Sequence, residues 1–307
     1  MNEQFLWTEK YRPQKIEDVV LPEMLKKIFS EFVQQKDIPN LLLSGPPGVG
    51  KTTVAKAMLE ELGCDYIVIN GSMNGNIDTL RTDIMSFASS VSFLSEGGRK
   101  YVILDEADYI TPEAQAALRG AIEEFSANCT FIFTCNFKSR LIEALHSRCS
   151  VIDFSLQPDE KPKMAAAFFN RIAEILDQEN ISYEKNVLVE ITKKYFPDYR
   201  RTLNELQRYS TSGKIDTGIL VQVVSIRNIQ ELVRYLKEKN FADMRKWVVV
   251  NADLDPARVF RKIYDSMYEY MKPESIPQAV VILAKYQYQS AFVADQEINL
   301  VACLTEI

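Results

Sequence analysis

The sequence Gly45-Pro46-Pro47-Gly48-Val49-Gly50-Lys51-Thr52 is a complete phosphate-binding loop. An apolar run, 41–44, precedes it and helix-forming residues, 52–58, follow it, so the loop joins a strand to a helix. Its glycines let backbone N–H groups turn around an anion at a helix N-terminus, whose partial positive charge favours phosphate. The sequence therefore predicts a nucleoside triphosphate site formed by this loop and Thr53. A Gly-Pro turn beside a helix is the alternative.

A second motif supplies acidic groups after another apolar segment. Tyr101–Leu104 runs directly into Asp105-Glu106-Ala107-Asp108. We expect Lys51 to reach the outer phosphates and Thr52 and Asp105 to hold Mg²⁺. Glu106 is the natural base for an attacking water, so the pair of motifs predicts hydrolysis of the nucleotide. A solvated acidic turn is the alternative interpretation.

Composition limits the class of protein. The chain has 307 residues, enough for two or three domains, with 47% hydrophobic and 25% charged residues, as in soluble globular proteins. No apolar stretch is long enough to span a membrane, and the N-terminus does not resemble a signal peptide, so we expect a cytoplasmic protein with no membrane partner. A net charge of −6 argues against general coating of DNA but leaves room for a local basic track.

The cysteines and the single histidine do not form a metal-binding pattern. The five cysteines are scattered, and we expect them to be small, mostly buried residues in a reducing compartment: Cys64, Cys129, Cys135, Cys149 and Cys303. His146 is predicted to be an ordinary polar residue near a helix end.

The first half of the chain alternates strands with helices. Short apolar segments lie at 41–44, 66–69, 101–104, 130–134 and 151–154, separated by helical patterns. This order predicts an α/β domain with a largely parallel sheet over residues 1–156. Between two of the strands, Thr111 and Pro112 mark the start of a helix as N-cap and first residue.

The second half is predicted to be helical. Apolar residues recur at helical spacing after Pro158, which indicates a small helical domain over 157–225. Further helical patterns, including one that opens at Asp255 and Pro256, predict a compact helical bundle over 226–307.

Several motifs together resemble one family. They are Trp7-Thr8-Glu9-Lys10-Tyr11-Arg12-Pro13, the phosphate loop, the 105–108 box, Asn136 after an apolar strand, and Ser147-Arg148-Cys149. This set resembles the sliding-clamp loader ATPases of the AAA+ class, including replication factor C small subunits. Within that family, Phe196–Thr202 is most similar to the large subunits of T4-type bacteriophage clamp loaders. The resemblance implies an AAA+ P-loop domain with a parallel five-stranded sheet, a helical lid and a helical collar for oligomerisation.

The resemblance also implies roles around the nucleotide. Tyr11, Arg12 and Pro13 would lie near the adenine, and the Asn136 amide would hold the attacking water near the γ-phosphate. Arg148 would be an arginine finger offered to the neighbouring subunit's nucleotide. The residues alone leave alternatives open, since Asn136 can cap a strand end and Arg148 can form a surface salt bridge.

Five further positions are assigned in the same way. Arg200 matches the second sensor of the lid, but Pro197-Asp198-Tyr199-Arg200 replaces the usual Gly-Asp-Met-Arg, which leaves Arg200 or Arg201 open. Gln115 falls where the family relays DNA binding to the catalytic glutamate, with an exposed helical glutamine as the alternative. Candidate contacts to a DNA backbone, or alternatively solvated helix residues, are Asn76, Arg81 and Arg119.

The implied function is that of an ATPase subunit of a DNA polymerase sliding-clamp loader, using ATP and Mg²⁺. ATP binding would drive clamp opening and primer-template DNA binding, and hydrolysis would release the closed clamp on DNA. The expected partners are copies of this chain, a distinct small subunit, the clamp and the DNA, in the host cytoplasm if a phage encodes the chain. Two alternatives remain: a hexameric AAA+ helicase or branch-migration motor, expected to end in a winged helix, and a nucleotide-binding scaffold subunit.

Overall fold

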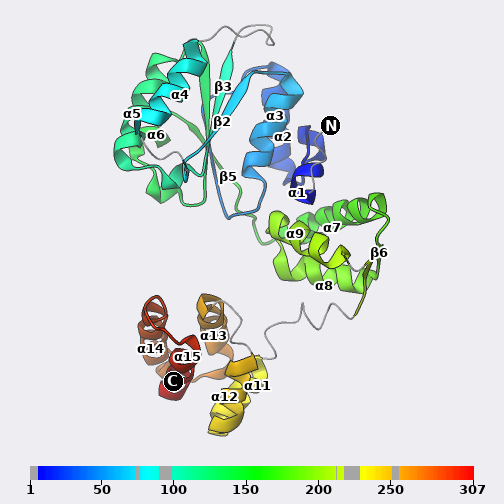
Figure 1. Cartoon of the computed structure of the whole chain (residues 1–307), viewed down its shortest axis with the longest axis vertical. Helices are drawn as coiled ribbons and strands as arrows, with labels where there is room; N and C mark the ends of the chain where they lie inside the picture. The colour runs from blue at the N-terminus through cyan, green and yellow to red at the C-terminus, as the bar shows by residue number, and fades with distance from the viewer. Residues whose placement is uncertain (1–5, 74–76, 90–98, 212, 218–228, 251–255) are drawn as a thin grey trace. The chain divides into compact units, whose positions relative to one another are not determined.

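The structure is a computed structural model that describes residues 6–73, 77–89, 99–211, 213–217, 229–250 and 256–307. The chain forms two compact units, Met1–Thr217 and Gly218–Ile307 (Figure 1). The first unit contains the sheet and the helices that directly follow it. The predicted boundary between residues 225 and 226 lies outside the described residues.

A five-stranded parallel sheet organises the first unit, as predicted. Its strands lie in the order β2-β3-β4-β1-β5, with bounds β1 Leu41–Ser44, β2 Tyr66–Asn70, β3 Lys100–Asp105, β4 Cys129–Cys135 and β5 Ser150–Asp153. The register pairs Ser44 at the end of β1 with Cys135 at the end of β4. The segment after each of these strands therefore starts at the same edge of the sheet.

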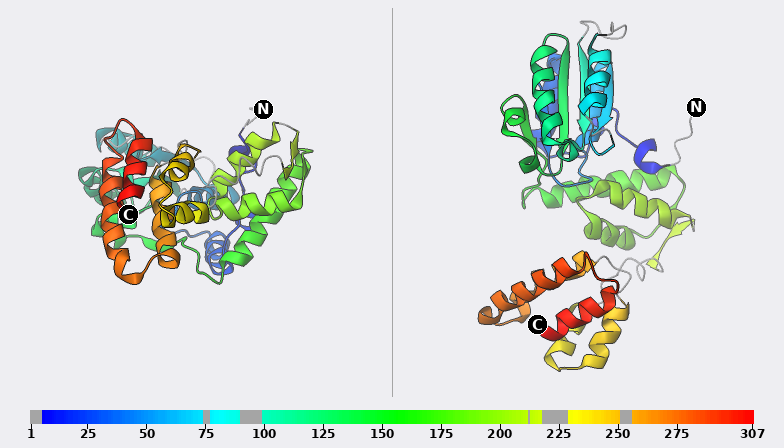
Figure 2. Two further views of the ribbon diagram at one scale, coloured as in Figure 1. Left: turned by 90° about the horizontal axis from the view of Figure 1, so that it is seen from below. Right: turned by 60° about the vertical axis from the view of Figure 1, so that its left-hand side comes forward.

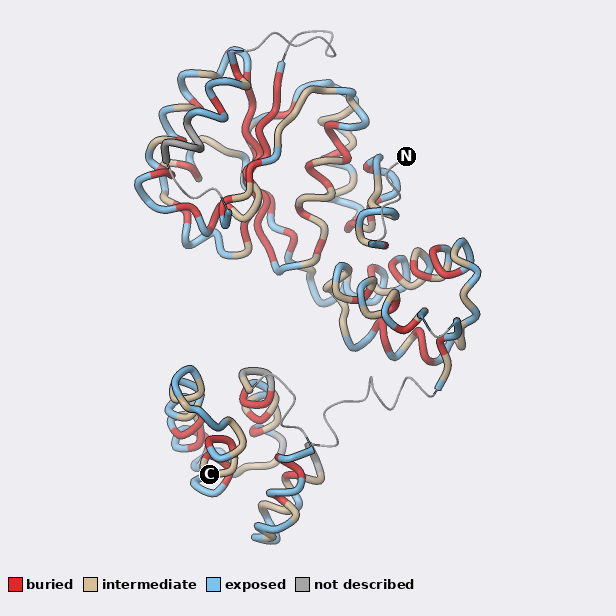
Figure 3. The backbone as a smooth tube through the Cα atoms, in the orientation of Figure 1, coloured by how far each residue is buried: buried red, intermediate tan, exposed pale blue. Residues whose placement is uncertain are grey.

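Helices cover both faces of this sheet because its central strands are apolar on both faces (Figure 2, right). Leu41 and Leu43 pack in one cluster with residues of α2 Glu23–Gln35 and α3 Lys51–Leu62, whereas Leu42 packs in another with α4 Ile77–Ser89 and α5 Pro112–Glu124. Buried residues accordingly run along the strands and the inner helix faces (Figure 3). Thr111 caps α5 as predicted, its hydroxyl accepting the Ala114 N–H at 3.3 Å.

Short elements complete the sheet domain: α1 Trp7–Lys10, the 3-10 turns η1 Ile16–Asp18, η2 Ala107–Tyr109 and η3 Lys138–Arg140, and α6 Glu143–His146. His146 ends α6, as predicted. All five cysteines are free, with Cys129, Cys135 and Cys303 buried, and burial raises the pKa of Cys135 to about 11.

Three helices follow the sheet: α7 Lys161–Gln178, α8 Lys185–Tyr195 and α9 Tyr199–Ser210. The structure adds a two-stranded parallel sheet, β6 Ser182–Tyr183 with β7 Lys214–Ile215, which the sequence did not predict. Two-residue strands carry no alternation of polar and apolar side chains, and this pair is nonlocal. We call the segment 157–217 the lid.

The second unit is a helical bundle, as predicted. It contains α11 Ile229–Lys237, α12 Phe241–Val250, α13 Pro256–Tyr270, η4 Pro273–Ser275, α14 Ile276–Gln289 and α15 Gln296–Glu306. Trp247, Phe260 and Leu283 belong to its buried core. Residues 229–250 and 256–307 include no strand, so this described part lacks the β-hairpin of a winged helix. No helix in the described parts of the chain is long and apolar enough to cross a membrane.

Candidate nucleotide site

The phosphate loop joins β1 to α3. Gly48 and Gly50 have φ angles of +76° and +96°, a left-handed region that glycine enters without a Cβ penalty. Gly48 also lies against the lid: a Cβ there would lie 1.9 Å from Asp198 Oδ1, and its carbonyl accepts the Tyr199 N–H at 3.0 Å. The lid therefore contacts the loop at a position where only glycine fits.

Lys51, the first residue of α3, is 8% exposed. Its ammonium donates to the carbonyls of Gly45 and Pro46, each at 2.7 Å, and to Asn136 Oδ1 at 2.9 Å. Burial lowers the pKa of Lys51 to about 8. These three acceptors are neutral, so a bound phosphate would supply the opposite charge that they do not give the buried ammonium.

Asp105 lies at the end of β3, beside the loop. Its Oδ1 accepts the hydroxyl of Thr52 at 2.6 Å and that of Thr134 at 2.5 Å. Carboxylate and hydroxyl oxygens are ligands that Mg²⁺ prefers, so this pair fits the predicted ion. Described residues contain no cluster of three His, Cys, Asp or Glu side chains, and Mg²⁺ sites of phosphate-loop proteins do not need one.

Glu106 follows in a left-handed backbone conformation, φ 55° and ψ 44°, which is uncommon for a residue with a Cβ. Its N–H donates to Thr134 Oγ1 at 3.2 Å, which fixes the turn from β3 into η2. Gly71 permits this turn, because a Cβ there would lie 2.6 Å from the Glu106 carbonyl oxygen. Strained conformations of this kind are held where the surrounding structure over-determines them.

Asp108 ties η2 to the end of β4. The side chain is 6% exposed, and its Oδ2 accepts the N–H groups of Asn136 and Phe137, both at 3.3 Å. Asn136 in turn accepts from Lys51. The second motif is therefore connected to the phosphate loop through the residue after β4.

One cavity collects most of the predicted nucleotide contacts. Its lining includes Tyr11, Arg12, Pro13, Pro47, Gly48, Gly50, Lys51, Thr52, Thr53, Asp105, Glu106, Asn136 and Arg200. Val49 is instead buried in the core, while Gly45 and Pro46 face Lys51 with their carbonyls. Arg200 lines this cavity, whereas the Arg201 guanidinium lies 5.1 Å from the Tyr195 ring centre. This geometry favours Arg200 as the arginine that meets the nucleotide.

The N-terminal segment links this cavity to the lid. The Tyr11 hydroxyl donates to Glu179 Oε1 at 2.6 Å, and Lys10 Nζ donates to the same oxygen at 2.6 Å. The Lys10 hydrogen bond lowers the pKa of Glu179, and burial raises the pKa of Tyr11. Arg12 pairs with Glu9 and reaches Thr53 Oγ1 at 3.4 Å.

Gln115 is 1% exposed, so the alternative of an exposed helical glutamine is wrong. Its Nε2 donates to the carbonyls of Ile110 and Arg140 at 2.9 and 3.2 Å, and its Oε1 accepts the Ile142 N–H at 2.8 Å. Gln115 therefore joins the segment after the acidic motif to the segment that leads into α6.

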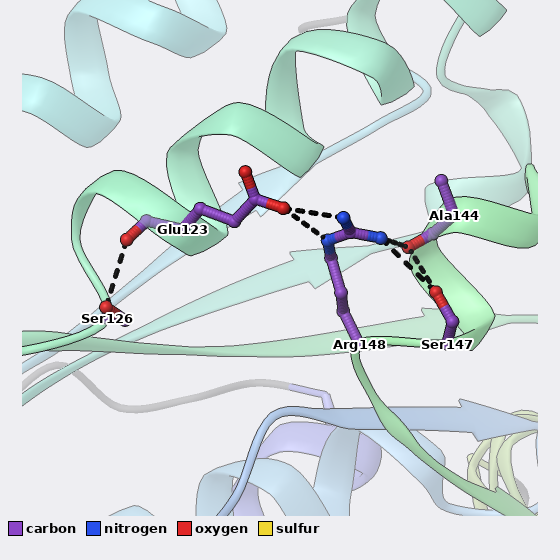
Figure 4. Close-up of polar contacts among 5 residues, drawn as sticks. All are labelled: Glu123, Ser126, Ala144, Ser147 and Arg148. Carbon is purple, nitrogen blue, oxygen red and sulfur yellow. Dashed lines mark hydrogen bonds and ion pairs between the residues drawn. The ribbon is translucent and has the colours of Figure 1, made fainter.

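Arg148 is not among the residues that line the cavity. Its guanidinium is held by Glu123 of α5 and by Ala144 and Ser147 of the preceding turn (Figure 4). The Arg148 side chain is 29% exposed and Glu123 54%, so the surface salt bridge considered as an alternative is present.

The structure describes the three candidate DNA contacts to different extents. Arg119 is exposed on α5, and Arg81 lies in α4 but its side chain is outside the described part. Asn76 lies outside the described residues.

The sequence interpretation missed several residues that shape the site: Gly71, Glu123, Thr134, Glu179 and Asp198. Thr134 carried a usable signal, since it is a polar residue that directly follows the apolar centre of its strand, Phe131–Phe133. The two carboxylates Glu123 and Glu179 pair with residues distant in the sequence, so no local pattern marks them.

Comparisons with known proteins agree with this geometry. The family model of AAA ATPases, associated with various cellular activities, matches residues 41–156, and the model of the sliding-clamp-loader large subunit AAA+ ATPase lid domain matches residues 160–221. The sliding-clamp-loader large subunit of Enterobacteria phage T4 is 35% identical over 297 residues, covering 95% of this chain and 92% of that protein.

Two further matches are to a replication factor C small subunit and to a solved RuvB structure. The replication factor C small subunit of Methanocella arvoryzae is 33% identical over 293 residues, covering 92% of this chain and 89% of that protein. A RuvB structure from Thermotoga maritima matches with TM-score 0.56 at 19% identity, covering 84% of this chain and 80% of that one, which shows a shared fold alone. The chain belongs to the family of sliding-clamp-loader AAA+ ATPases.

Proposed function

We propose that this cavity binds ATP with Mg²⁺ and hydrolyses it. The observation that carries the proposal is the convergence of Lys51, Asp105, Glu106 and Asn136 at the carboxyl edge of one sheet. Lys51 binds the outer phosphates, and Thr52 and Asp105 hold the metal. Mg²⁺, when bound, neutralises charge on the phosphate oxygens. Glu106 takes a proton from the attacking water, which the Asn136 amide orients.

The nucleotide base lies toward the N-terminal segment in this proposal. Tyr11, Arg12 and Pro13 line the same cavity as the phosphate loop, and α7 and α9 close it from the lid side. Arg200, at the start of α9, senses the phosphates. The contact between Gly48 and Tyr199 supports this role, because it holds the start of α9 against the loop.

Arg148 completes the site of a neighbouring subunit as an arginine finger. Its place outside its own cavity and its partial exposure support a role in trans. Hydrolysis then depends on assembly, since a finger contributes about 10³- to 10⁵-fold in kcat.

The assembly consists of copies of this chain with a distinct small subunit, and it acts on a sliding clamp and primer-template DNA in the cytoplasm. ATP binding opens the clamp and favours gripping of the DNA, and hydrolysis releases the closed clamp. Asn76, Arg81 and Arg119 contact the DNA backbone without reading sequence. Gln115 relays DNA binding to Glu106; its hydrogen bonds to Ile110, which follows that motif, and to the segment that leads into α6 support this role.

The test is the ATPase rate of the purified chain with partner subunits, clamp and primed DNA added singly and together. We expect stimulation only when all are present. A rate that ignores them contradicts the proposal, and processive strand unwinding supports the motor alternative. Nucleotide binding without phosphate release supports the scaffold alternative.

A further inference from the structure

The guanidinium of Arg148 is almost fully occupied within its own subunit. Nε and Nη2 both donate to Glu123 Oε1, at 2.9 and 2.6 Å. Nη1 donates to the Ala144 carbonyl at 2.8 Å and to Ser147 Oγ at 3.2 Å. Of its five N–H groups, only one on Nη2 has no partner among these contacts.

These contacts divide the guanidinium into two edges (Figure 4). The Ala144 carbonyl of α6 and the Ser147 hydroxyl hold Nη1, and Glu123 holds the edge formed by Nε and Nη2. Two parallel N–H groups on one edge are what an arginine uses to bind a phosphate bidentately. Glu123 therefore occupies the edge that a phosphate needs.

We propose that Glu123 is a positioning residue. Its carboxylate binds the Arg148 guanidinium in the unassembled subunit and competes with the neighbouring subunit's triphosphate for it. We call the Glu123–Arg148 ion pair the parking contact. The proposal rests on the role of Arg148 in trans. When the neighbour's nucleotide approaches, the carboxylate gives up the Nε and Nη2 edge, while Ala144 and Ser147 keep Nη1 in place. A dianionic phosphate oxygen cluster carries more charge than one carboxylate, so the exchange favours the nucleotide.

The exposure of the pair limits how strongly it can hold. Glu123 is 54% exposed and Arg148 29%, and solvated ion pairs are weak and screened by salt. The parking contact therefore lowers the trans hydrolysis rate modestly. Losing it should raise the rate by about 1.5- to 5-fold, the range expected for exposed ion pairs.

The experiment compares Glu123→Gln and Glu123→Ala with wild type in the assembled loader with clamp and primed DNA. Both should raise kcat by about 1.5- to 5-fold with KM for ATP unchanged. Glu124→Gln is the matched control, because it removes the same charge from the next exposed position of the same helix and should leave kcat unchanged. In an Arg148→Ala background, the Glu123 substitutions should have no effect.

The outcomes separate this proposal from the one it rests on. If Arg148→Ala leaves the stimulated rate unchanged, the trans role fails. If Arg148→Ala lowers the rate but the Glu123 variants are neutral, the parking proposal is overturned. If the Glu123 variants are slower, it is also overturned and Glu123 supports the finger instead. NMR titration of the isolated subunit checks the contact itself: the Arg148 hydrogen bond lowers the pKa of Glu123, so Arg148→Ala should raise it.

Discussion

Lys51→Met removes the buried ammonium of the phosphate loop and should change how stability depends on pH. Burial places the pKa of Lys51 at about 8 in the folded chain, against 10.5 for an unburied lysine. Between these values the unfolded chain holds a proton that the folded chain has released. Stability of the nucleotide-free wild type therefore rises with pH in this window, and the Lys51 contribution is absent from the variant.

The size of the effect follows from the two pKa values. Linkage gives a rise of about 1 kcal/mol in the wild-type unfolding free energy relative to Lys51→Met between pH 7 and pH 9. The absolute difference at one pH is less informative, since the variant also leaves the Gly45 and Pro46 carbonyls without their donor. The change of this free-energy difference with pH reports the protonation of Lys51 alone.

Urea denaturation at several pH values, on both proteins without nucleotide, measures this difference. Saturating ATP and Mg²⁺ provide an internal control, because an adjacent phosphate raises the pKa of Lys51 and should abolish the rise below pH 9 in the wild type. Without nucleotide, the unfolding free energy of the wild type minus that of the variant should rise from pH 7 to pH 9. If this difference stays constant, burial does not lower the pKa of Lys51 and the reasoning is refuted.

Three further substitutions test separate contacts. Arg148→Ala should leave nucleotide binding nearly intact, by fluorescent-nucleotide titration, and lower the assembled ATPase rate about 10³-fold; equal loss of both would make Arg148 structural. Gly48→Ala should destabilise the first unit more than Gly63→Ala, which shares a left-handed backbone but has nothing within 4 Å of its Cβ; equal changes in melting temperature would remove the Asp198 contact from the argument. Gln115→Ala should cost about 2–4 kcal/mol in denaturant unfolding, because one buried and two partly buried backbone groups lose their partner; a change below about 0.5 kcal/mol would contradict that.

The sheet was predictable because its strands are parallel and covered on both faces. Such strands read as short, nearly continuous apolar runs, and the five predicted segments match β1 to β5 within one residue at each end. The lid sheet was not predictable. Ser182–Tyr183 and Lys214–Ile215 are two residues each, and their pairing depends on the packing of the three helices between and around them.

The site was predictable where a motif is local and missed where a contact is distant. The phosphate loop and the acidic motif are continuous in sequence, and their residues meet because β1 and β3 both lie next to β4. Gln115 shows the limit. Its spacing to Leu118 and Ile122 places it on the buried face of α5, but its partners at Ile110, Arg140 and Ile142 come from separate turns. The sequence therefore left an exposed glutamine open as the alternative to the relay role, and only the fold shows that Gln115 is buried.

The phosphate loop, 45–52, is also where the lid contacts the sheet domain. This contact couples the nucleotide-binding loop to the position of α9. The Gly48 carbonyl accepts the Tyr199 N–H. Asp198 caps α9 by accepting the Arg201 N–H, and it fills the space that a side chain at position 48 would need. On the other side of the loop, Lys51 holds Asn136. A shift of the loop must therefore move either the start of α9, which carries Arg200, or the hydrogen bond to Asn136, so the two residues that we propose as sensors are both linked to one segment.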